Sequence, residues 1–216
     1  MSATALVPAS DPTPAAEPAR IGPNAIIQMR EVLIERLGRR EAGRILAQAG
    51  LSGYVFEPPH AMVDEGEVAA LHVALRAACG EARAAELGFE AGLRTGRYLL
   101  ANRIPALARA VLKLMPAPLA SRLLLKAVAR NSWTFAGSGH FTVLASTPTA
   151  RVRITDCPLV RGLRLRLPGC AFYAGTFEAL FRALVHRDAR ARQTACEGRG
   201  DAACLFEISW PSRGRA

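Results

Sequence analysis

The spacing of hydrophobic and polar positions divides the chain into a helical part and a strand-rich part. Between Asn24 and Arg130, apolar residues recur every three or four positions, which is the spacing of one face of an amphipathic helix. Glycines and prolines interrupt this pattern and mark the ends of separate helices. The pattern predicts helices over about 24–37, 40–49, 64–79, 81–101, 105–114 and 119–130.

Residue types at the helix ends support these bounds. Asn24 is placed to cap the first helix, and Asp64 followed by Glu67 matches a capping box at the start of the third. Pro116 and Pro118 are expected to break the chain before the last helix, because proline lacks the amide hydrogen that a helix interior needs.

After Asn131 the apolar period changes from three or four to two, which is typical of half-buried strands. Pro168-Gly169 interrupts the strands and opens one inserted helix, over about 170–187. Helices followed by a mostly antiparallel sheet indicate an α+β fold. The predicted strands cover 140–145, 151–155, 162–167, 190–195 and 204–210, and the last two form a hairpin.

A chain of 216 residues, half of them hydrophobic, predicts one folded domain. We place it at 23–212, with a helical part over 23–131 and a strand-rich part over 132–210. Residues 1–22, rich in proline and alanine, are expected to be a disordered tail. No secretory signal or long apolar run is visible, and five cysteines is an odd count, so we expect reduced thiols and a cytoplasmic protein.

The net charge of +10 is concentrated in one stretch of sequence. Residues 91–155 contain ten arginines or lysines and no aspartate or glutamate. Such a stretch attracts anions: lipid headgroups, nucleic acid, or carboxylate-bearing ligands. Nucleic acid is not expected as a partner, because no recognised binding motif accompanies the charge. On the helix at 119–130, Arg122, Lys126 and Arg130 form one basic stripe.

The cysteines of the strand-rich part are candidate ligands for zinc or another metal. The hairpin brings Cys196 near Cys204, and Cys170 at the start of the inserted helix can meet them. In a regular strand, however, Cys196 shares the charged face of Arg190 and Arg192, whereas Cys204 lies on an apolar face. A bulge would reconcile the two faces. The alternative is that the three thiols are small buried hydrophobic groups.

Arginine pairs on the predicted strands suggest an arginine-covered sheet face that grips carboxylates. The pairs are Arg151/Arg153, Arg164/Arg166 and Arg190/Arg192, and the alternative is an ordinary solvated face. His140 and His186 are candidate axial ligands of a metallated macrocycle, although a single histidine is more often structural.

Motifs for catalysis are missing. Residues 137–142 lack the third glycine of a dinucleotide-binding loop and precede a strand, and neither a phosphate-binding loop nor a nucleophile elbow is present. The sequence therefore favours binding over catalysis.

Four segments together resemble the 4-vinyl reductase domain family of bacteriochlorophyll biosynthesis. They are Asn131–Gly139 (NSWTFAGSG), Cys157-Pro158, Gly169–Glu178 (GCAFYAGTFE) and Cys196–Ile208 (CEGRGDAACLFEI). The resemblance implies the fold of the ligand-binding domains of nitric-oxide signalling and Golgi transport, with helices packed on a small antiparallel sheet. It also implies metal binding at Cys170, Cys196 and Cys204, and a role at or near reduction of a ring vinyl group.

Three functions follow as hypotheses. The first is a carrier or accessory protein that binds a tetrapyrrole, a flat apolar plate with acidic propionates, in an apolar interior ringed by arginine. The second is the vinyl reductase itself, fed by a cysteine-bound metal cluster. The third is a peripheral membrane module for pathway enzymes, in which the helix at 119–130 docks on anionic lipid. Whether the chain forms a homodimer stays open. The candidate ligand-binding residues are Arg122, Arg130, Trp133, Phe135, His140, Arg164, Phe172 and Tyr173.

Overall fold

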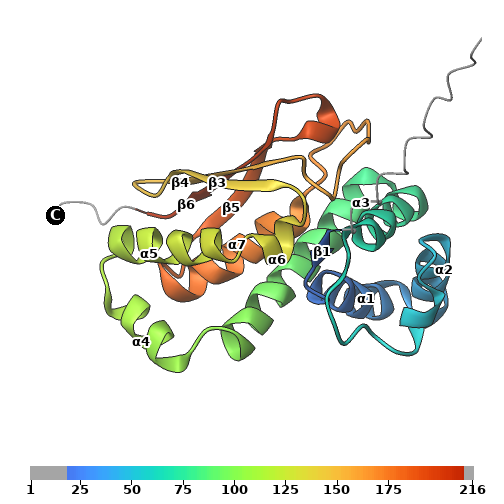
Figure 1. Cartoon of the computed structure of the whole chain (residues 1–216), viewed down its shortest axis with the longest axis horizontal. Coiled ribbons are helices and arrows are strands. Elements are labelled where there is room, and N and C mark those ends of the chain that lie inside the picture. The colour runs from blue at the N-terminus through green and yellow to red at the C-terminus, as the bar shows by residue number, and fades with distance from the viewer. Residues whose placement is uncertain (1–18, 212–216) are drawn as a thin grey trace, which may run out of the picture.

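Helices fill the first part of the computed structural model and strands the last, over the described residues 19–211 (Figure 1). This order confirms the predicted α+β class. The helices are α1 (Asn24–Leu37), α2 (Arg39–Gln48), α3 (Glu65–Asn102), α4 (Ala106–Leu114), α5 (Ala117–Arg130), α6 (Trp133–Ala136) and α7 (Ala171–Leu184), with 3₁₀ turns η1 (Ser52–Val55) and η2 (Glu197–Arg199).

Helix α3 is the long central element, and it is kinked at Gly80, where φ is 76°. Its two arms are the helices predicted at 64–79 and 81–101, and glycine accepts the positive φ at the kink without steric cost. Asp64 caps the helix as predicted, since its carboxylate accepts the amide hydrogen of Gly66 at 2.7 Å. Glu67 does not complete a capping box; it accepts a hydrogen bond from the Tyr54 hydroxyl at 3.0 Å.

Three predictions about chain ends and breaks need correction. Asn24 is the first residue of α1 and not its cap, and its side chain accepts a hydrogen bond from Gln28. Pro118 lies in the first turn of α5, where a missing amide hydrogen costs nothing, so only Pro116 separates α4 from α5. Of the predicted disordered tail, residues 1–18 lie outside the described residues, and Ile21 is buried in strand β1 (Arg20–Ile21), which pairs with β2 (Val63–Asp64).

The main sheet is antiparallel, with the strand order β3-β4-β6-β5. One face packs on α5 and α7 (Figure 1) and buries alternate residues of β4 and β6, such as Val152 and Phe206. The four strands are β3 (His140–Ala145), β4 (Ala150–Thr155), β5 (Arg190–Ala195) and β6 (Cys204–Ser209), all within one residue of their predicted bounds.

The strand predicted at 162–167 is wrong: this segment is a loop. Its amide groups bond outside any sheet, because the Glu81 carboxylate accepts the amide hydrogens of Arg166 and Leu167, and Leu165 donates to the Gly198 carbonyl. Arg164 and Arg166 therefore do not belong to the sheet.

The predicted arginine face forms only in part. Arg151 and Arg153 on β4 and Arg190 and Arg192 on β5 are exposed on the outer face, but β6 lies between the two strands. Glu207 of β6 pairs in register with Arg151 and Arg192, and it forms an ion pair with Arg192 at 2.7 Å. A carboxylate thus already occupies the middle of this face.

Helices α3 and α7 pack backbone to backbone through glycines. A Cβ atom on Gly92 would lie 2.0 Å from the Phe172 carbonyl oxygen, and one on Gly175 would lie 2.2 Å from the Phe89 carbonyl oxygen. Because the obstructing atoms are main chain, no side-chain rotation relieves these clashes. The two helices can lie this close only while these positions carry no side chain.

Gly92→Ala is expected to lower the free energy of unfolding by about 3 kcal/mol, the upper end for overpacking, because the added methyl group must push two helix backbones apart. Gly88→Ala is the matched control on the same helix, since its Cβ meets its nearest neighbour at 3.7 Å. Urea denaturation followed by circular dichroism measures both. The control should be neutral or slightly stabilising, because alanine favours helix; equal losses in both variants would contradict the close-packing account.

Candidate functional site: a buried thiol cluster

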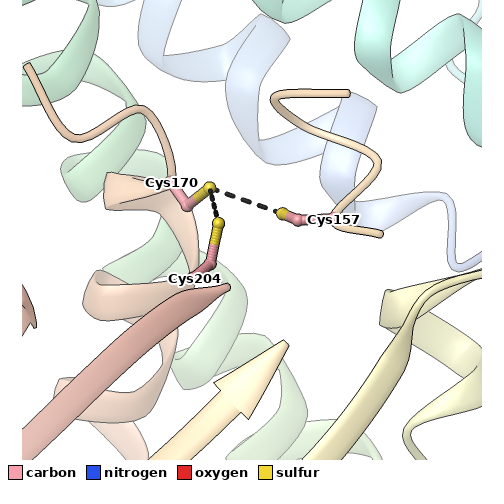
Figure 2. Close-up of side chains that lie close together, drawn as sticks. All are labelled: Cys157, Cys170 and Cys204. Atoms are coloured by element: carbon pink, nitrogen blue, oxygen red, sulfur yellow. Dashed lines mark hydrogen bonds between the residues drawn. The ribbon is translucent and has the colours of Figure 1, made fainter. Parts of the chain in front are cut away.

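Three buried cysteines from separate segments meet beneath one end of the sheet (Figure 2). Cys157 follows β4, Cys170 directly precedes α7, and Cys204 begins β6. The Sγ atom of Cys170 lies 3.4 Å from that of Cys157 and 3.6 Å from that of Cys204. All three sulfur atoms lie within 4.8 Å of one another.

Polar side chains from elsewhere hold the cysteine-bearing loops in place. The Glu197 carboxylate accepts the amide hydrogens of Asp156 and Cys157, each at 2.8 Å. The Gln193 side chain accepts the amide hydrogen of Cys170 at 2.8 Å. Arg76 of α3, mostly buried, donates to the carbonyls of Leu159 and Gly169 at 3.3 and 2.6 Å. The cluster is therefore fixed from both the sheet and α3.

Cys196 lies next to the cluster because β5 contains a bulge. The register of β5 against β6 shifts between Gln193 and Ala195, so Thr194 is an extra residue in the strand. Beyond the bulge, Cys196 turns to the buried side, and its sulfur accepts the amide hydrogen of Gly169 at 3.3 Å. The bulge thus removes the conflict of faces that a regular strand would impose.

The buried thiols shift one another's acidity. Hydrogen bonds from the thiols of Cys170 and Cys204 lower the pKa of Cys157 to about 5. Burial raises the pKa of Cys170 well above its ordinary value, and its contacts with Cys157, Cys196 and Cys204 raise it further. The cluster therefore favours a single thiolate at Cys157, hydrogen-bonded by protonated neighbours.

This donor set fits a zinc-type metal ion. Thiolates bound to one tetrahedral zinc at about 2.3 Å have sulfur atoms roughly 3.8 Å apart, close to the 3.4 and 3.6 Å measured here. Two backbone amides already point at sulfur, Gly169 to Cys196 and Glu197 to Cys204, as the outer shell of a thiolate site requires. Cys157, Cys170 and Cys204 would hold the ion, and Cys196 is the nearest further thiol.

The sequence prediction had two of these three ligands. Cys170 and Cys204 meet as expected, Cys196 lies beside them, and Cys157 was not among the predicted ligands. Its proximity depends on the pairing of β4 with β6, which places Ile154 opposite Cys204. The Cys157-Pro158 pair in the family resemblance was the available signal for it.

Three of the predicted ligand-binding residues lie together in an aromatic cluster. The ring of Tyr173 lies 6.0 Å from those of both Phe135 and Phe172, and 6.1 Å from that of Phe206. The Tyr173 hydroxyl donates to the Phe135 carbonyl at 2.7 Å and ties α7 to α6. Since Tyr173 is one turn from Cys170, the aromatic cluster adjoins the thiols.

The other five candidates lie on the surface: Arg122, Arg130, Trp133, His140 and Arg164 are exposed. Arg130, Trp133 and His140 surround the solvent side of Phe135, because they follow one another through α5, α6 and the start of β3. Arg164 lies apart from them in the loop at 161–169, and Arg122 lies on the outer side of α5. His186 is half-buried and its Nδ1 accepts the amide hydrogen of Asp188.

The hollows beside these clusters are small. One, next to the thiols, is lined by His72, Arg76, Gly169 and Phe172 and has a volume of about 10 Å³, which is room for one water molecule. His72 is buried there, and its Nε2 has no hydrogen-bond partner among the described residues. Burial lowers the pKa of His72 to about 3, so its ring is neutral.

The other hollow is a cleft of about 310 Å³ where the start of α3 meets the loop after β4, beside Glu65 and Arg161. Burial alone would raise the pKa of Glu65. The hydrogen bonds from Ser138 and the Arg161 guanidinium outweigh burial and lower that pKa below its ordinary value. The charges of this cleft therefore satisfy each other.

Similar proteins place the chain in a family. Residues 150–209 match the 4-vinyl reductase domain, within the range 132–210 predicted for its signature. The bacteriochlorophyll synthase 23 kDa chain of Cereibacter sphaeroides is 44% identical over 88% of this chain and 90% of its own. That of Rhodobacter capsulatus is 41% identical over 91% of this chain and 90% of its own. The chain belongs to the family of the bacteriochlorophyll synthase 23 kDa chain.

Solved structures with the same fold are H-NOX proteins. The H-NOX protein of K. algicida, in the Fe(II) unliganded state, aligns with a TM-score of 0.58 at 14% identity, over 91% of this chain and all of its own. That of S. oneidensis, in the Fe(II)NO ligation state, aligns with a TM-score of 0.55 at 10% identity, over 89% of this chain and all of its own. These likenesses confirm the predicted fold. For this member of the 23 kDa chain family, all four clustered cysteines lie inside the segment that matches the 4-vinyl reductase domain.

Cys157→Ser is expected to weaken Zn²⁺ or Co²⁺ binding by more than a hundredfold, because loss of a ligand costs more than the 10- to 100-fold typical of outer-shell changes. Protein purified without oxygen, titrated with Co²⁺ and followed by its sulfur-to-metal absorption, measures this. Cys79→Ser is the control, since Cys79 lies on α3 outside the cluster. Equal cobalt spectra in the two variants, or none in the unaltered protein, would rule out this metal site.

The neutral, buried His72 predicts that stability falls with acid. Its pKa is lowered from 6.5 to about 3 on folding, so its contribution is complete above pH 6.5 and is lost as the pH falls toward 3, at about 1.4 kcal/mol per pH unit. His72→Leu should therefore lose about 1.4 kcal/mol less than the unaltered protein between pH 7.5 and 5.5 in urea denaturation. Replacing the exposed His60 with Gln should leave the pH dependence as it was; if His72→Leu does the same, His72 is not neutral by burial.

Proposed function

We propose that the protein is an accessory subunit of bacteriochlorophyll synthesis that binds a tetrapyrrole of the porphyrin or divinyl protochlorophyllide type for reduction of its vinyl group. The observation that carries the proposal is the 44% identity, over nearly the whole chain, to a protein named as a chain of bacteriochlorophyll synthase. A separate subunit that holds the substrate needs no dinucleotide-binding loop, and the sequence has no recognisable one.

The aromatic cluster at the junction of α6 and β3 is the site best suited to a flat apolar ring. Phe135 and Phe141 are half-buried with ring centroids 5.4 Å apart, and β3 is an edge strand of the sheet. Trp133 beside them is 61% exposed. A macrocycle stacked here would cover apolar surface that is now wet, and Arg130 is close enough in sequence to meet a propionate.

Binding at this site requires the junction to open. The two hollows described above are respectively too small and already filled with paired charge, so neither offers a ready cavity. The half-buried side chains of α6 and β3 are the least costly to separate, because part of their surface is already in water. We therefore assign the ligand to a site that forms as α6 moves away from β3.

We assign the thiol cluster a structural role beside this site. A bound zinc ion would tie the loop after β4, the start of α7 and the start of β6 together, and so fix one end of the aromatic cluster. The alternative, a vinyl reductase that draws electrons through the cluster, requires a redox-active metal at the same cysteines.

Trp133→Ala should weaken tetrapyrrole binding about three- to tenfold, the range expected for losing one aromatic stacking contact. The measurement is titration of the full chain with protoporphyrin, its magnesium derivative and divinyl protochlorophyllide, followed by their absorbance and fluorescence. Trp210→Phe is the matched control, because Trp210 packs on Phe181 at the far end of α7.

Absence of spectral change at micromolar protein with all three compounds would refute tetrapyrrole binding. Equal affinities for the two tryptophan variants would refute the site. An anaerobic assay with NADPH or reduced ferredoxin tests the alternative, since turnover of divinyl substrate by the metal-loaded chain alone would show a reductase rather than an accessory subunit.

A further inference from the structure

Helix α4 exposes the apolar stripe that an amphipathic helix normally buries. Leu107, Val111 and Leu114 recur at intervals of four and three residues and so share one face. They are 77%, 41% and 88% exposed, and α4 buries none of its residues. The opposite face holds the helix to the body, where Arg109 donates to the Leu100 carbonyl at 2.7 Å. The hydrophobic side of α4 therefore points away from the protein.

Helix α5 continues this exposed surface and adds charge to it. Its inner face is buried through Leu124 and Leu125 and is held by a hydrogen bond from Ser121 to the Ser146 carbonyl. On its outer face Leu119 and Leu123 are 45% and 41% exposed. The predicted basic stripe, Arg122, Lys126 and Arg130, lies on this same outer face and is exposed throughout. We call the outer sides of both helices the α4–α5 face.

The positive charges of the α4–α5 face are unneutralised. None of Lys113, Arg122, Lys126 or Arg130 forms an ion pair with any residue in 19–211, and the sequence has no acidic residue from 91 to 155. The arginines at the other end behave differently: Arg36 and Arg94 are both paired with glutamates. Figure 1 shows α4 and α5 at the end of the molecule opposite α1 and α2.

We propose that the α4–α5 face docks the protein on an anionic lipid bilayer. The exposed leucines enter the boundary between headgroups and acyl chains, while the interleaved lysine and arginines meet lipid phosphates. A bilayer fits this face better than a protein partner, because the surface combines isolated, fully exposed leucines with one sign of charge. No helix among residues 19–211 is long and apolar enough to cross a bilayer, so the contact is with one surface only.

The proposed orientation also places Trp133 near the lipid. Helix α5 leads directly into α6, where Trp133 is 61% exposed, and tryptophan favours the interface between water and membrane. Docking does not depend on tetrapyrrole binding: it rests on the exposure and charge of α4 and α5 alone.

Co-sedimentation of the full chain with vesicles tests the proposal. Vesicles of phosphatidylcholine with about one-third phosphatidylglycerol should pellet the protein, pure phosphatidylcholine should pellet far less, and added salt should release it. Arg122→Gln with Lys126→Gln should lower the partition coefficient roughly twentyfold, since each basic residue near such a surface contributes about a fivefold effect.

Matched variants at the opposite end separate docking from general stickiness. Arg39→Gln with Arg40→Gln removes the same charge from the start of α2 and should leave pelleting unchanged. Leu114→Ser should weaken binding at least fivefold, whereas Phe56→Ser, at a residue with a similar exposure of 83%, should not. All four sites are exposed, and circular dichroism confirms that each variant is folded.

Failure to pellet with anionic vesicles would overturn the proposal and leave the α4–α5 face to a protein partner. Equal losses from the α2 and α5 charge pairs would also overturn it, because binding would then follow net charge and not this face.

Discussion

At Gly92 and Gly175 the backbones of α3 and α7 pass so close that neither helix has room for a side chain. Both candidate clusters depend on this contact. Helix α7 begins one residue after Cys170 and carries Tyr173 in its first turn, so the depth at which α7 sits against α3 sets the position of a thiol and of the central aromatic ring. The same contact brings the Arg76 side chain of α3 within reach of the Gly169 carbonyl. The thiol cluster is thus tied to the helical part as well as to the sheet.

Most of the fold could be predicted because its signals are local. Glycine at 38 and 80, the Asp64 cap and the change of apolar period after Asn131 act over a few residues, and the helices and four strands follow them closely. The segment at 162–167 alternates like a strand but is not one, because its amides find the Glu81 carboxylate instead of a neighbouring strand. A partner more than eighty residues away leaves no mark on the local pattern.

The candidate site was harder to predict, for the same reason. Cys157 joins the thiols only because β4 pairs with β6, and strand order is a property of the whole sheet. Likewise, the apolar period of 105–114 predicts a helix but says nothing of whether its hydrophobic side is covered, and in α4 that side is bare. Family resemblance supplied Cys170, Cys196 and Cys204 as a group; it did not supply the distances that set Cys196 at the margin of the cluster.

The bulge at Thr194 makes the number of residues in β5 matter more than their identity. Thr194 itself is exposed, and a different side chain there would leave the pairing of Gln193 with Phe206 and of Ala195 with Leu205 intact. Removing the residue altogether would restore a regular alternation and turn Cys196 to the solvent side, since a shift of one position exchanges the two faces of a strand. Among related chains this position should therefore vary freely in type and yet resist deletion.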